Sequence, residues 1–457
     1  MDILNVVDDI IDQLSLTLSE PSNASDGLSS CQMLYQLASH KVWGVDETNI
    51  LAFLSKRLDI SGKFFLSYRS NGRKSTDLLL TDRDWLSLAQ AIFVKAVLKV
   101  KECSLPALHL KQFNTLFKAM DLQPSPWLTE PVSDAIEQSW SALQAELKSE
   151  FSQVNITYYD HHNPTTSKTC LPLTVLFYEG PIARAYLETL ASLNLKPEKI
   201  IQLVPRNDIA TKKPIGRWLP KSLRIAYSAN IQSSKIHFWP KKLKKSYSAL
   251  THPMTTEIER KLSFSASAIE SANALLPLSH YSDNIEPILI ENLADQALHQ
   301  HLTNEAKGAI LFTGGGIMPS TLLSLSHLKF LHIHPGFLPD IRGADCALWS
   351  TLSAGYFSAS CFYMAPGIDT GDIITPCWLP KIDLSAVPRD TEMLDGYRAI
   401  YSFIDPWVRS YVLRDVLINA SVGLDELSCI KQDEEEGTTF HFMHDRLKQA
   451  ALNKIFI

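Results

Sequence analysis

The residue types best suited to chemistry in this chain are a histidine and a later carboxylate. His334 ends an apolar run and opens a proline-containing loop, and Asp369 lies in the glycine-framed turn Gly-Ile-Asp-Thr-Gly-Asp (367–372). An imidazole near a carboxylate can hold and transfer a proton at a reacting carbonyl, because the carboxylate orients the ring and favours its protonated form. The pair therefore indicates an enzyme that catalyses proton transfer at a carbonyl.

The sequence around this pair predicts strands that alternate with helices. Strands are predicted at residues 173–178, 200–204, 287–290, 308–313, 328–333 and 358–364, and helices at residues 182–193, 293–302, 319–326, 391–404 and 406–419. Such β-α-β alternation is typical of a parallel sheet with helices on its faces. The expected fold class is therefore α/β, with a Rossmann-like, mostly parallel sheet. Ligands of these sheets bind beyond the carboxyl ends of the strands, which is where both residues of the pair fall.

The length of 457 residues predicts more than one domain. Residues 1–155 are expected to form a mostly helical domain of unknown role, residues 165–390 the catalytic α/β domain, and residues 391–457 a helical extension with a short strand.

Within the catalytic region, residues 207–250 are rich in lysine and arginine and only weakly periodic. This stretch is interpreted as a solvated face, with the alternative that it steers a phosphate-bearing acceptor.

Composition narrows the class of protein. Hydrophobic residues make up 45% of the chain and charged residues 20%, which is typical of a globular protein. The formal charge of −6 gives no reason to expect nucleic-acid or membrane binding. The cysteines are scattered without a CxxC motif, and the N-terminus lacks the basic start of a signal peptide. We therefore expect a cytoplasmic protein with reduced thiols and no metal site.

A run of three glycines precedes the histidine loop. Gly314, Gly315 and Gly316 are followed by Ile317 and Met318. Glycine lets the backbone approach a flat ligand closely, although a tight strand-to-helix turn would use the same residues. The run does not fit GxGxxG, so a nicotinamide dinucleotide is not favoured.

The stretch from Gly314 to Asp372 resembles the folate-dependent formyltransferase superfamily. Members of that superfamily carry an Asn-x-His-Pro loop that ends in Arg-Gly or Lys-Gly, followed by a Gly-x-Asp-x-Gly turn. The corresponding residues here are His332-Ile333-His334-Pro335, Leu338-Pro339, Arg342-Gly343 and Gly367-Ile368-Asp369-Thr370-Gly371. The glycine run with Ile317, Met318 and Pro319 resembles the superfamily's folate-side loop.

The resemblance implies formyl transfer from N10-formyltetrahydrofolate to a primary amine of a small-molecule acceptor, such as an amino sugar or an amino-acid-like compound. By the same resemblance, His334 would polarise the formyl group and shuttle a proton, and Asp369 would tune that histidine. The pterin would be held by the backbone around residues 315–318 and 365–369. The folate-binding residues expected from it are Gly315, Gly316, Ile317, Met318, Gly367 and Asp372.

One departure from the superfamily's pattern concerns His332, which stands where the signature asparagine is expected. Asparagine donates a hydrogen bond to an oxyanion in any protonation state, whereas a neutral imidazole has a single N–H and donates only in the right tautomer. His332 is therefore expected either to replace the donor as a third catalytic residue or to mark a change of chemistry. The alternatives are a hydrolase of the formyl donor, a related one-carbon enzyme, or a non-catalytic folate-binding scaffold. Homo-oligomerisation is left open.

Overall fold

The computed structural model describes residues 154–158, 169–432, 438–440, 443 and 445–456. The helical domain predicted for residues 1–155 therefore lies almost entirely outside the described residues. The chain divides into two compact units, and the one described below comprises residues 156–351, 355–437 and 452–457.

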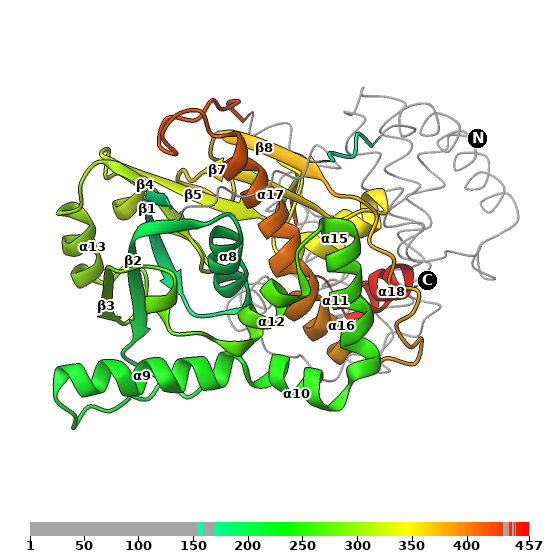
Figure 1. Ribbon diagram of the computed structural model, residues 1–457, viewed down its shortest axis with the longest axis horizontal. Helices are drawn as coiled ribbons and strands as arrows, with labels where there is room; N and C mark the ends of the chain where they lie inside the picture. The colour runs from blue at the N-terminus through cyan, green and yellow to red at the C-terminus, as the bar shows by residue number, and fades with distance from the viewer. Residues whose placement is uncertain (1–153, 159–168, 433–437, 441–442, 444, 457) are drawn as a thin grey trace, which may run out of the picture. The chain divides into compact units, whose positions relative to one another are not determined.

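A seven-stranded sheet forms the centre of this unit (Figure 1). Its strands in chain order are β1 (Thr169–Tyr178), β2 (Leu195–Pro205), β3 (Ile285–Ile290), β4 (Gly308–Phe312), β5 (Leu328–His334), β7 (Ser358–Tyr363) and β8 (Ile373–Trp378). The spatial order is β3-β2-β1-β4-β5-β7-β8. The first five strands are parallel to one another, and β7 pairs antiparallel with both β5 and β8. The expected Rossmann-like, mostly parallel sheet is confirmed.

The order of the parallel strands indicates at which edge of the sheet a ligand would bind. The chain moves outward from β1 to β3 and then returns to β4 on the other side of β1. Ligands of open α/β sheets bind at such a reversal, beyond the carboxyl ends of the strands. The loops that follow β4 and β5 leave from that edge, and they contain the glycine run and His334.

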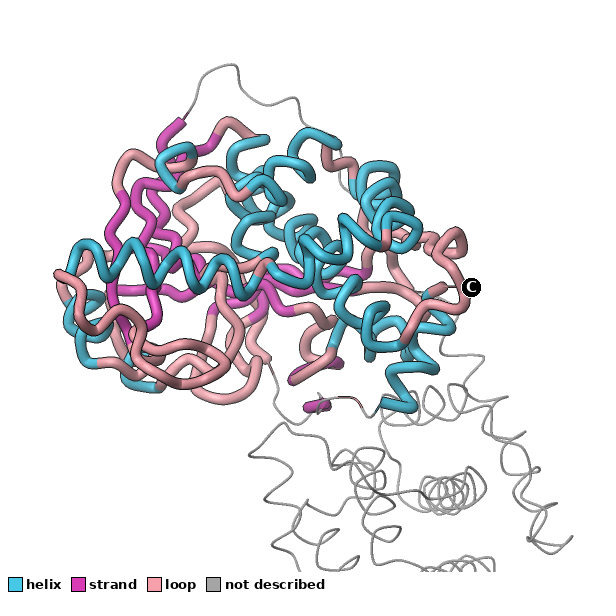
Figure 2. Tube along the Cα trace, turned by 90° about the horizontal axis from the view of Figure 1, so that it is seen from below, coloured by secondary structure: helices cyan, strands magenta, loops and turns pink. Residues whose placement is uncertain are grey.

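Helices connect the strands, and most of them lie to one side of the sheet (Figure 2). They are α8 (Pro181–Ser192), α9 (Lys221–Ile236), α10 (Phe238–Ser246), α11 (Ser248–Leu262), α12 (Ala266–Ala274), α13 (Gln296–Thr303), α14 (Ser320–Leu323), α15 (Cys346–Ala354), α16 (Met393–Ala399) and α17 (Asp405–Asn419). Short 3₁₀ and π segments occupy Leu278–His280 and Ile400–Ile404, and the chain also forms β6 (Ile341–Gly343), β9 (Thr438–Phe440) and α18 (Asp445–Ile455). None of the helices in the described part is both long and apolar enough to cross a membrane.

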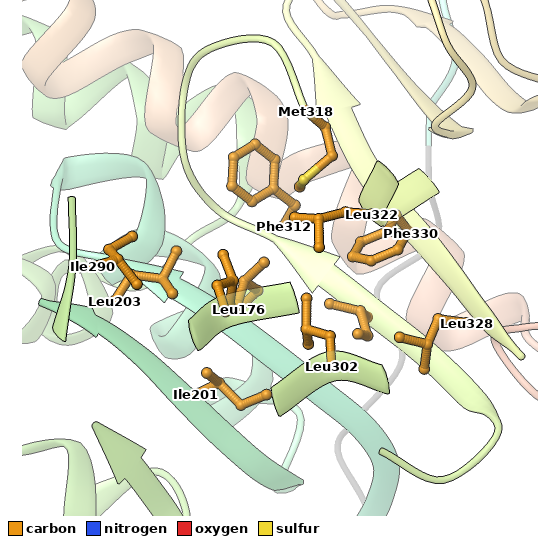
Figure 3. Close-up of a cluster of buried hydrophobic side chains, with 12 residues drawn as sticks. Leu176, Ile201, Leu203, Ile290, Leu302, Phe312, Met318, Leu322, Leu328 and Phe330 are labelled. Atoms are coloured by element: carbon orange, nitrogen blue, oxygen red, sulfur yellow. The ribbon is translucent and has the colours of Figure 1, made fainter. Parts of the chain in front are cut away.

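The two faces of the sheet bury different sets of side chains, because successive residues of a strand point to opposite faces. On one face Leu176, Phe312 and Phe330 pack in a single cluster with Leu302 of α13 and Leu322 of α14 (Figure 3). On the opposite face α8 and α17 pack against each other, and α17 also packs on β5 and β7. Since β5 alternates, His332 and His334 continue the face that begins with Leu328 and Phe330.

Residues 207–250, for which no element was predicted, contain α9, α10 and the start of α11. The buried positions of α9 are Ser228 and Gln232, both polar, so the helix has no apolar stripe that a periodicity argument could detect. Prolines at positions 240 and 253 lie within α10 and α11 and further obscure the pattern. The strand β8 was also missed.

Candidate active site

His334 lies at the carboxyl end of β5 with both ring nitrogens facing protein acceptors. Its Nε2 lies 2.9 Å from the carbonyl oxygen of Ile341, and its Nδ1 lies 3.3 Å from Oδ2 of Asp369. A carbonyl can only accept, so Nε2 carries a hydrogen. The His334 side chain is buried, whereas the Asp369 carboxylate is 17% exposed. The structure thus brings the two predicted residues together, with the carboxylate on the open side.

The loop after β5 folds back on the ring because Gly336 has no side chain. A Cβ at this position would lie 2.3 Å from the carbonyl oxygen of Ile341 and 2.6 Å from Nε2 of His334. Ser360 of β7 fixes the same loop, because its Oγ donates to the carbonyl of Gly336 (2.7 Å) and accepts from the amide of Leu338 (2.9 Å). These contacts hold the imidazole in one orientation.

Asp369 is held by backbone groups. Its Oδ2 accepts a hydrogen bond from the amide of Gly343 (3.0 Å), and its backbone adopts φ +55°, which few non-glycine residues tolerate. The amide nitrogen of the Gln432 side chain donates to the carbonyls of Asp369 and Gly371. A Cβ at Gly371 would lie 1.6 Å from the carbonyl oxygen of Tyr363, so glycine is required for the turn to close.

His332 is two residues before His334 on the same face of β5. Its Nδ1 lies 3.2 Å from the carbonyl oxygen of Phe312, at the end of β4. The ring packs 5.6 Å from the ring of Phe312 and 5.9 Å from that of Phe362. His332 is therefore fixed by a backbone carbonyl of β4, whereas His334 faces the Asp369 carboxylate.

A buried ion pair lies behind the two histidines. Asp405 is fully buried and accepts from Nε of Arg409 at 3.1 and 3.0 Å, and Nη1 of Arg409 donates to the carbonyl of Ile333 (2.9 Å). Burial, assisted by the Arg409 cation, lowers the pKa of His332 to about 4 although Asp369 opposes the shift. Burial also lowers the pKa of His334, against the Asp369 carboxylate and with help from Arg409. Both rings are thus biased toward the neutral form.

The surroundings of His334 are suited to hold a transient proton. A neutral ring that donates through Nε2 leaves a lone pair on Nδ1 facing the Asp369 carboxylate, so two acceptors face each other there. A proton between Nδ1 and Oδ2 removes that mismatch, while burial resists a permanent charge. The pair can therefore take up and release one proton.

The residues expected to bind folate differ in accessibility. Gly315, Gly316 and Ile317 are exposed in the loop after β4, and Gly367 and Asp372 are exposed beside the Asp369 turn. The space around a Cβ at Gly315 or Gly316 is empty. Met318 is instead 3% exposed and packs in the core cluster (Figure 3), so its side chain is directed away from the loop surface.

Sequence reasoning missed three supporting residues, Arg409, Ser360 and Gln432. Arg409 had a detectable signal, because Asp405 and Arg409 form a charged pair at helical spacing in an otherwise apolar stretch. Ser360 lies in an apolar strand, and nothing in its sequence context distinguishes it from a small core residue.

One group of side chains in the described part has the geometry of a metal site. Glu286, His301 and Glu305 lie close together near β3 and α13. Lys199 already contacts both carboxylates, at 3.2 Å and 2.9 Å. The lysine therefore offsets part of the negative charge of the cluster, whose carboxylates belong to β3 and to the segment after α13.

Comparison with known proteins finds relatives of one kind. No family model matches the sequence. A methionyl-tRNA formyltransferase from Lachnospira eligens is 24% identical over 168 residues, which are 36% of this chain and 49% of that protein. The chain thus spans about half the length of the curated relative that it matches.

Solved structures give weaker similarity. A sugar N-formyltransferase from Shewanella is 13% identical, with 62% of this chain and 87% of that chain covered and a TM-score of 0.32. A methionyl-tRNA formyltransferase from Clostridium thermocellum is 17% identical, with 42% and 69% covered and a TM-score of 0.24. TM-scores this low do not establish a common fold.

The sequence is thus similar to that of a methionyl-tRNA formyltransferase over part of its length. The two residues on which the resemblance to the folate-dependent formyltransferase superfamily depends, His334 and Asp369, lie 3.3 Å apart at the carboxyl end of β5.

Proposed function

We propose that this protein transfers a formyl group from N10-formyltetrahydrofolate to a primary amine of a small-molecule acceptor, an amino sugar or an amino-acid-like compound. The observation that carries the proposal is the His334–Asp369 pair, buried on the histidine side and open on the carboxylate side, beside a glycine loop at the ligand edge. The similarity to a methionyl-tRNA formyltransferase supports the same class of reaction.

Transfer to an amine requires that the amine lose a proton as its nitrogen bonds to the formyl carbon. N10-formyltetrahydrofolate would supply that carbon as the electrophile. The Asp369 carboxylate reaches the open side of the site, and His334 behind it can share a proton with it. Backbone amides of the glycine loop are candidates to donate to the developing oxyanion, because they need no change of protonation.

The loops present fit a folate-sized ligand in two respects. The space beside Gly315 and Gly316 is open, and φ of +108° at Gly316 and +132° at Gly367 is accessible mainly to glycine, so both loops can expose backbone to a flat ring. Ile317 is 70% exposed and Ile368 is 42% exposed, so each loop also offers an aliphatic side chain to the ring's apolar face. Gly315, Gly316, Ile317 and Gly367 are thus the residues that would hold the pterin.

The acceptor is proposed to carry a phosphate. Lys212, Lys213 and Arg217 are exposed in the loop that follows β2, and β2 ends at the same edge of the sheet as β5. A nucleotide-linked amino sugar would bring both an amine and phosphates to this edge. Since the curated relative is named for tRNA, methionyl-tRNA is the competing phosphate-bearing acceptor.

The test is incubation of the full chain with N10-formyltetrahydrofolate, alone and with a panel of nucleotide-linked amino sugars, amino acids and methionyl-tRNA. Amine-dependent release of tetrahydrofolate with formation of a formamide supports the transferase. Release without any acceptor would indicate a hydrolase, and folate binding without turnover would indicate a scaffold. The transferase proposal fails if no amine accelerates release.

We also propose that residues 165–390 form the catalytic region and that α16 and α17 of residues 391–457 support it, since Arg409 contacts the strand of the two histidines.

The five cysteines of the described part are free thiols, which accords with the proposed cytoplasmic location. Comparison of tagged protein in cell fractions would test that location.

A further inference from the structure

The two histidines of β5 differ in which ring nitrogen is left for a substrate. Both nitrogens of His334 face protein atoms, the carbonyl of Ile341 and the carboxylate of Asp369, and the residue is 2% exposed. His332 uses only Nδ1, which faces the carbonyl of Phe312. In the described part of the chain, Nε2 of His332 is therefore the imidazole nitrogen of this site without a protein partner.

The carbonyl of Phe312 fixes the tautomer of His332. A carbonyl oxygen has no hydrogen to donate, so Nδ1 must carry the N–H. A neutral ring then has a bare lone pair on Nε2, which is an acceptor. A neutral ring in this tautomer cannot donate through Nε2 to an oxyanion as the superfamily's asparagine would.

The free nitrogen of His332 is open to solvent. Nε2 of His332 is not among the buried polar atoms that lack a partner, so it is not sealed from solvent. His332 and His334 share one face of β5, and a strand rise of about 3.3 Å per residue puts them roughly 7 Å apart. The glycine loop begins directly after Phe312, the residue that anchors the ring.

We propose that Nε2 of His332 accepts the proton that the attacking amine loses, and that His334 is a positioning residue that holds Asp369 and the loop. This inference rests on the proposed function. As the amine nitrogen bonds to the formyl carbon, its proton moves to Nε2. The bond from the formyl carbon to N10 then breaks, and the proton held on Nε2 passes to N10, so that His332 returns to its neutral form.

The charges around His332 agree with a neutral base. Arg409 and Asp405 belong to α17, Asp369 to the turn before β8 and His334 to β5 itself, and the rings of Phe312 and Phe362 pack beside His332. Burial and Arg409 hold the pKa of His332 at about 4. The ring is therefore unprotonated, and able to accept, throughout the neutral pH range.

The tautomer can be tested without substrate. The full chain is labelled with 15N-histidine, and the nitrogen chemical shifts of His332 are measured from about pH 6 to 8. They should show Nδ1 protonated and Nε2 unprotonated, because a ring with a low pKa stays neutral in this range. The signals are assigned by their loss in His332→Asn. Protonation at Nε2 in this range would overturn the inference.

The role is tested by turnover. His332→Asn should lower kcat by about 10²-fold or more, the usual contribution of a general base, while tetrahydrofolate binds with unchanged affinity. Imidazole added to His332→Ala should restore part of the lost rate, which a merely structural role would not allow. His327→Asn is the matched control, since His327 precedes β5 and contacts the carbonyl of Leu302 instead.

The outcomes separate the two proposals. If the wild-type chain transfers formyl groups but His332→Asn keeps full activity, His332 is not the base and only this inference fails. If the wild-type chain transfers nothing to any amine, the proposed function fails and the inference falls with it.

Discussion

In the described part of this unit, two buried histidines each face a carboxylate, and the two pairs are built differently. His334 faces Asp369 at 3.3 Å, and Asp369 has one further side-chain hydrogen bond, from the amide of Gly343. His237 faces Glu179 at 2.9 Å, and both side chains are only 5% exposed. Arg184 adds two hydrogen bonds to Glu179, at 2.9 Å to Oε1 and 2.6 Å to Oε2. We call the Glu179 pair saturated, because both oxygens of its carboxylate accept hydrogen bonds from side chains. The Asp369 pair is not saturated in this sense.

Saturation determines what each pair can do. Burial alone would raise the pKa of Glu179, but hydrogen bonds from His237 and Arg184 outweigh it and hold that pKa at about 2. Glu179 is then a permanent anion that joins β1 to α8 and to the start of α10. Among the described residues, His334 is the one ion-pair partner of Asp369, so that pair keeps an open side and can exchange a proton. A histidine and a carboxylate thus make a structural cluster in one place and a reactive pair in the other.

The largest effect is expected on turnover. Asp369→Asn should lower kcat for formyl transfer by about 10²–10⁴-fold, because the amide lacks the negative charge that Asp369 presents to His334 and to the open side of the site. Glu179→Gln should leave kcat per folded molecule within about twofold if its pair is purely structural. The measurement is release of tetrahydrofolate with each variant. Equal losses in both variants would remove the distinction between the pairs.

The second effect is on stability, where the Glu179 pair should matter more than the Asp369 pair. Glu179→Gln should lower the free energy of unfolding by about 3–5 kcal/mol, since it leaves the buried Arg184 charge uncompensated. Asp283→Asn is the matched control: its carboxylate also pairs with a cation, Lys196, but is 84% exposed, so the change should be below about 1 kcal/mol. Urea unfolding followed by circular dichroism compares them. Similar values for both variants would argue against a structural role for the saturated pair.

The third effect is a pH dependence of stability in two windows. Between pH 6.5 and about 4, unfolded His332 binds a proton that the folded ring refuses, so stability falls as pH falls, by about 3 kcal/mol in all. Between pH 4.5 and about 2, Glu179 is protonated in the unfolded chain but stays ionised in the folded chain, and stability falls again. In urea titrations across pH, His332→Asn should reduce the upper window, in which the lowered pKa of His334 still contributes, and Glu179→Gln should remove the lower window. If both variants keep both windows, these two groups are not the cause.

The smallest effect concerns the ion pair behind the site. The double variant Asp405→Asn with Arg409→Met removes both charges, and loss of the Arg409 cation should raise the pKa of His332 by about one unit or less. A 15N titration of His332 measures the shift. The pKa of His332 would stay unchanged if burial alone depresses it.

Prediction from sequence succeeded where the signal was local. The apolar runs of β1 and β4 were recognised because continuous burial on both faces leaves a nearly unbroken hydrophobic segment. It failed for α9, whose buried face is polar, and for β8, which contains Pro376. For the site, His334 and Asp369 were named from motif residues, whereas Arg409 and Ser360 were missed because their contribution depends on contacts far along the chain.

The sequence by itself determined the class of fold and the residues that form the proposed reactive pair, since hydrophobic periodicity and the spacing of His334, Gly343 and Asp369 are encoded locally. Only the tertiary structure decided what each histidine nitrogen faces. His332 and His334 are the same residue type two positions apart on one strand, yet one ring is anchored by the carbonyl of Phe312 and the other by Ile341 and Asp369. Those partners come from other elements of the fold. Which ring nitrogen of each histidine carries the hydrogen depends on these partners, so it could not be predicted from the sequence.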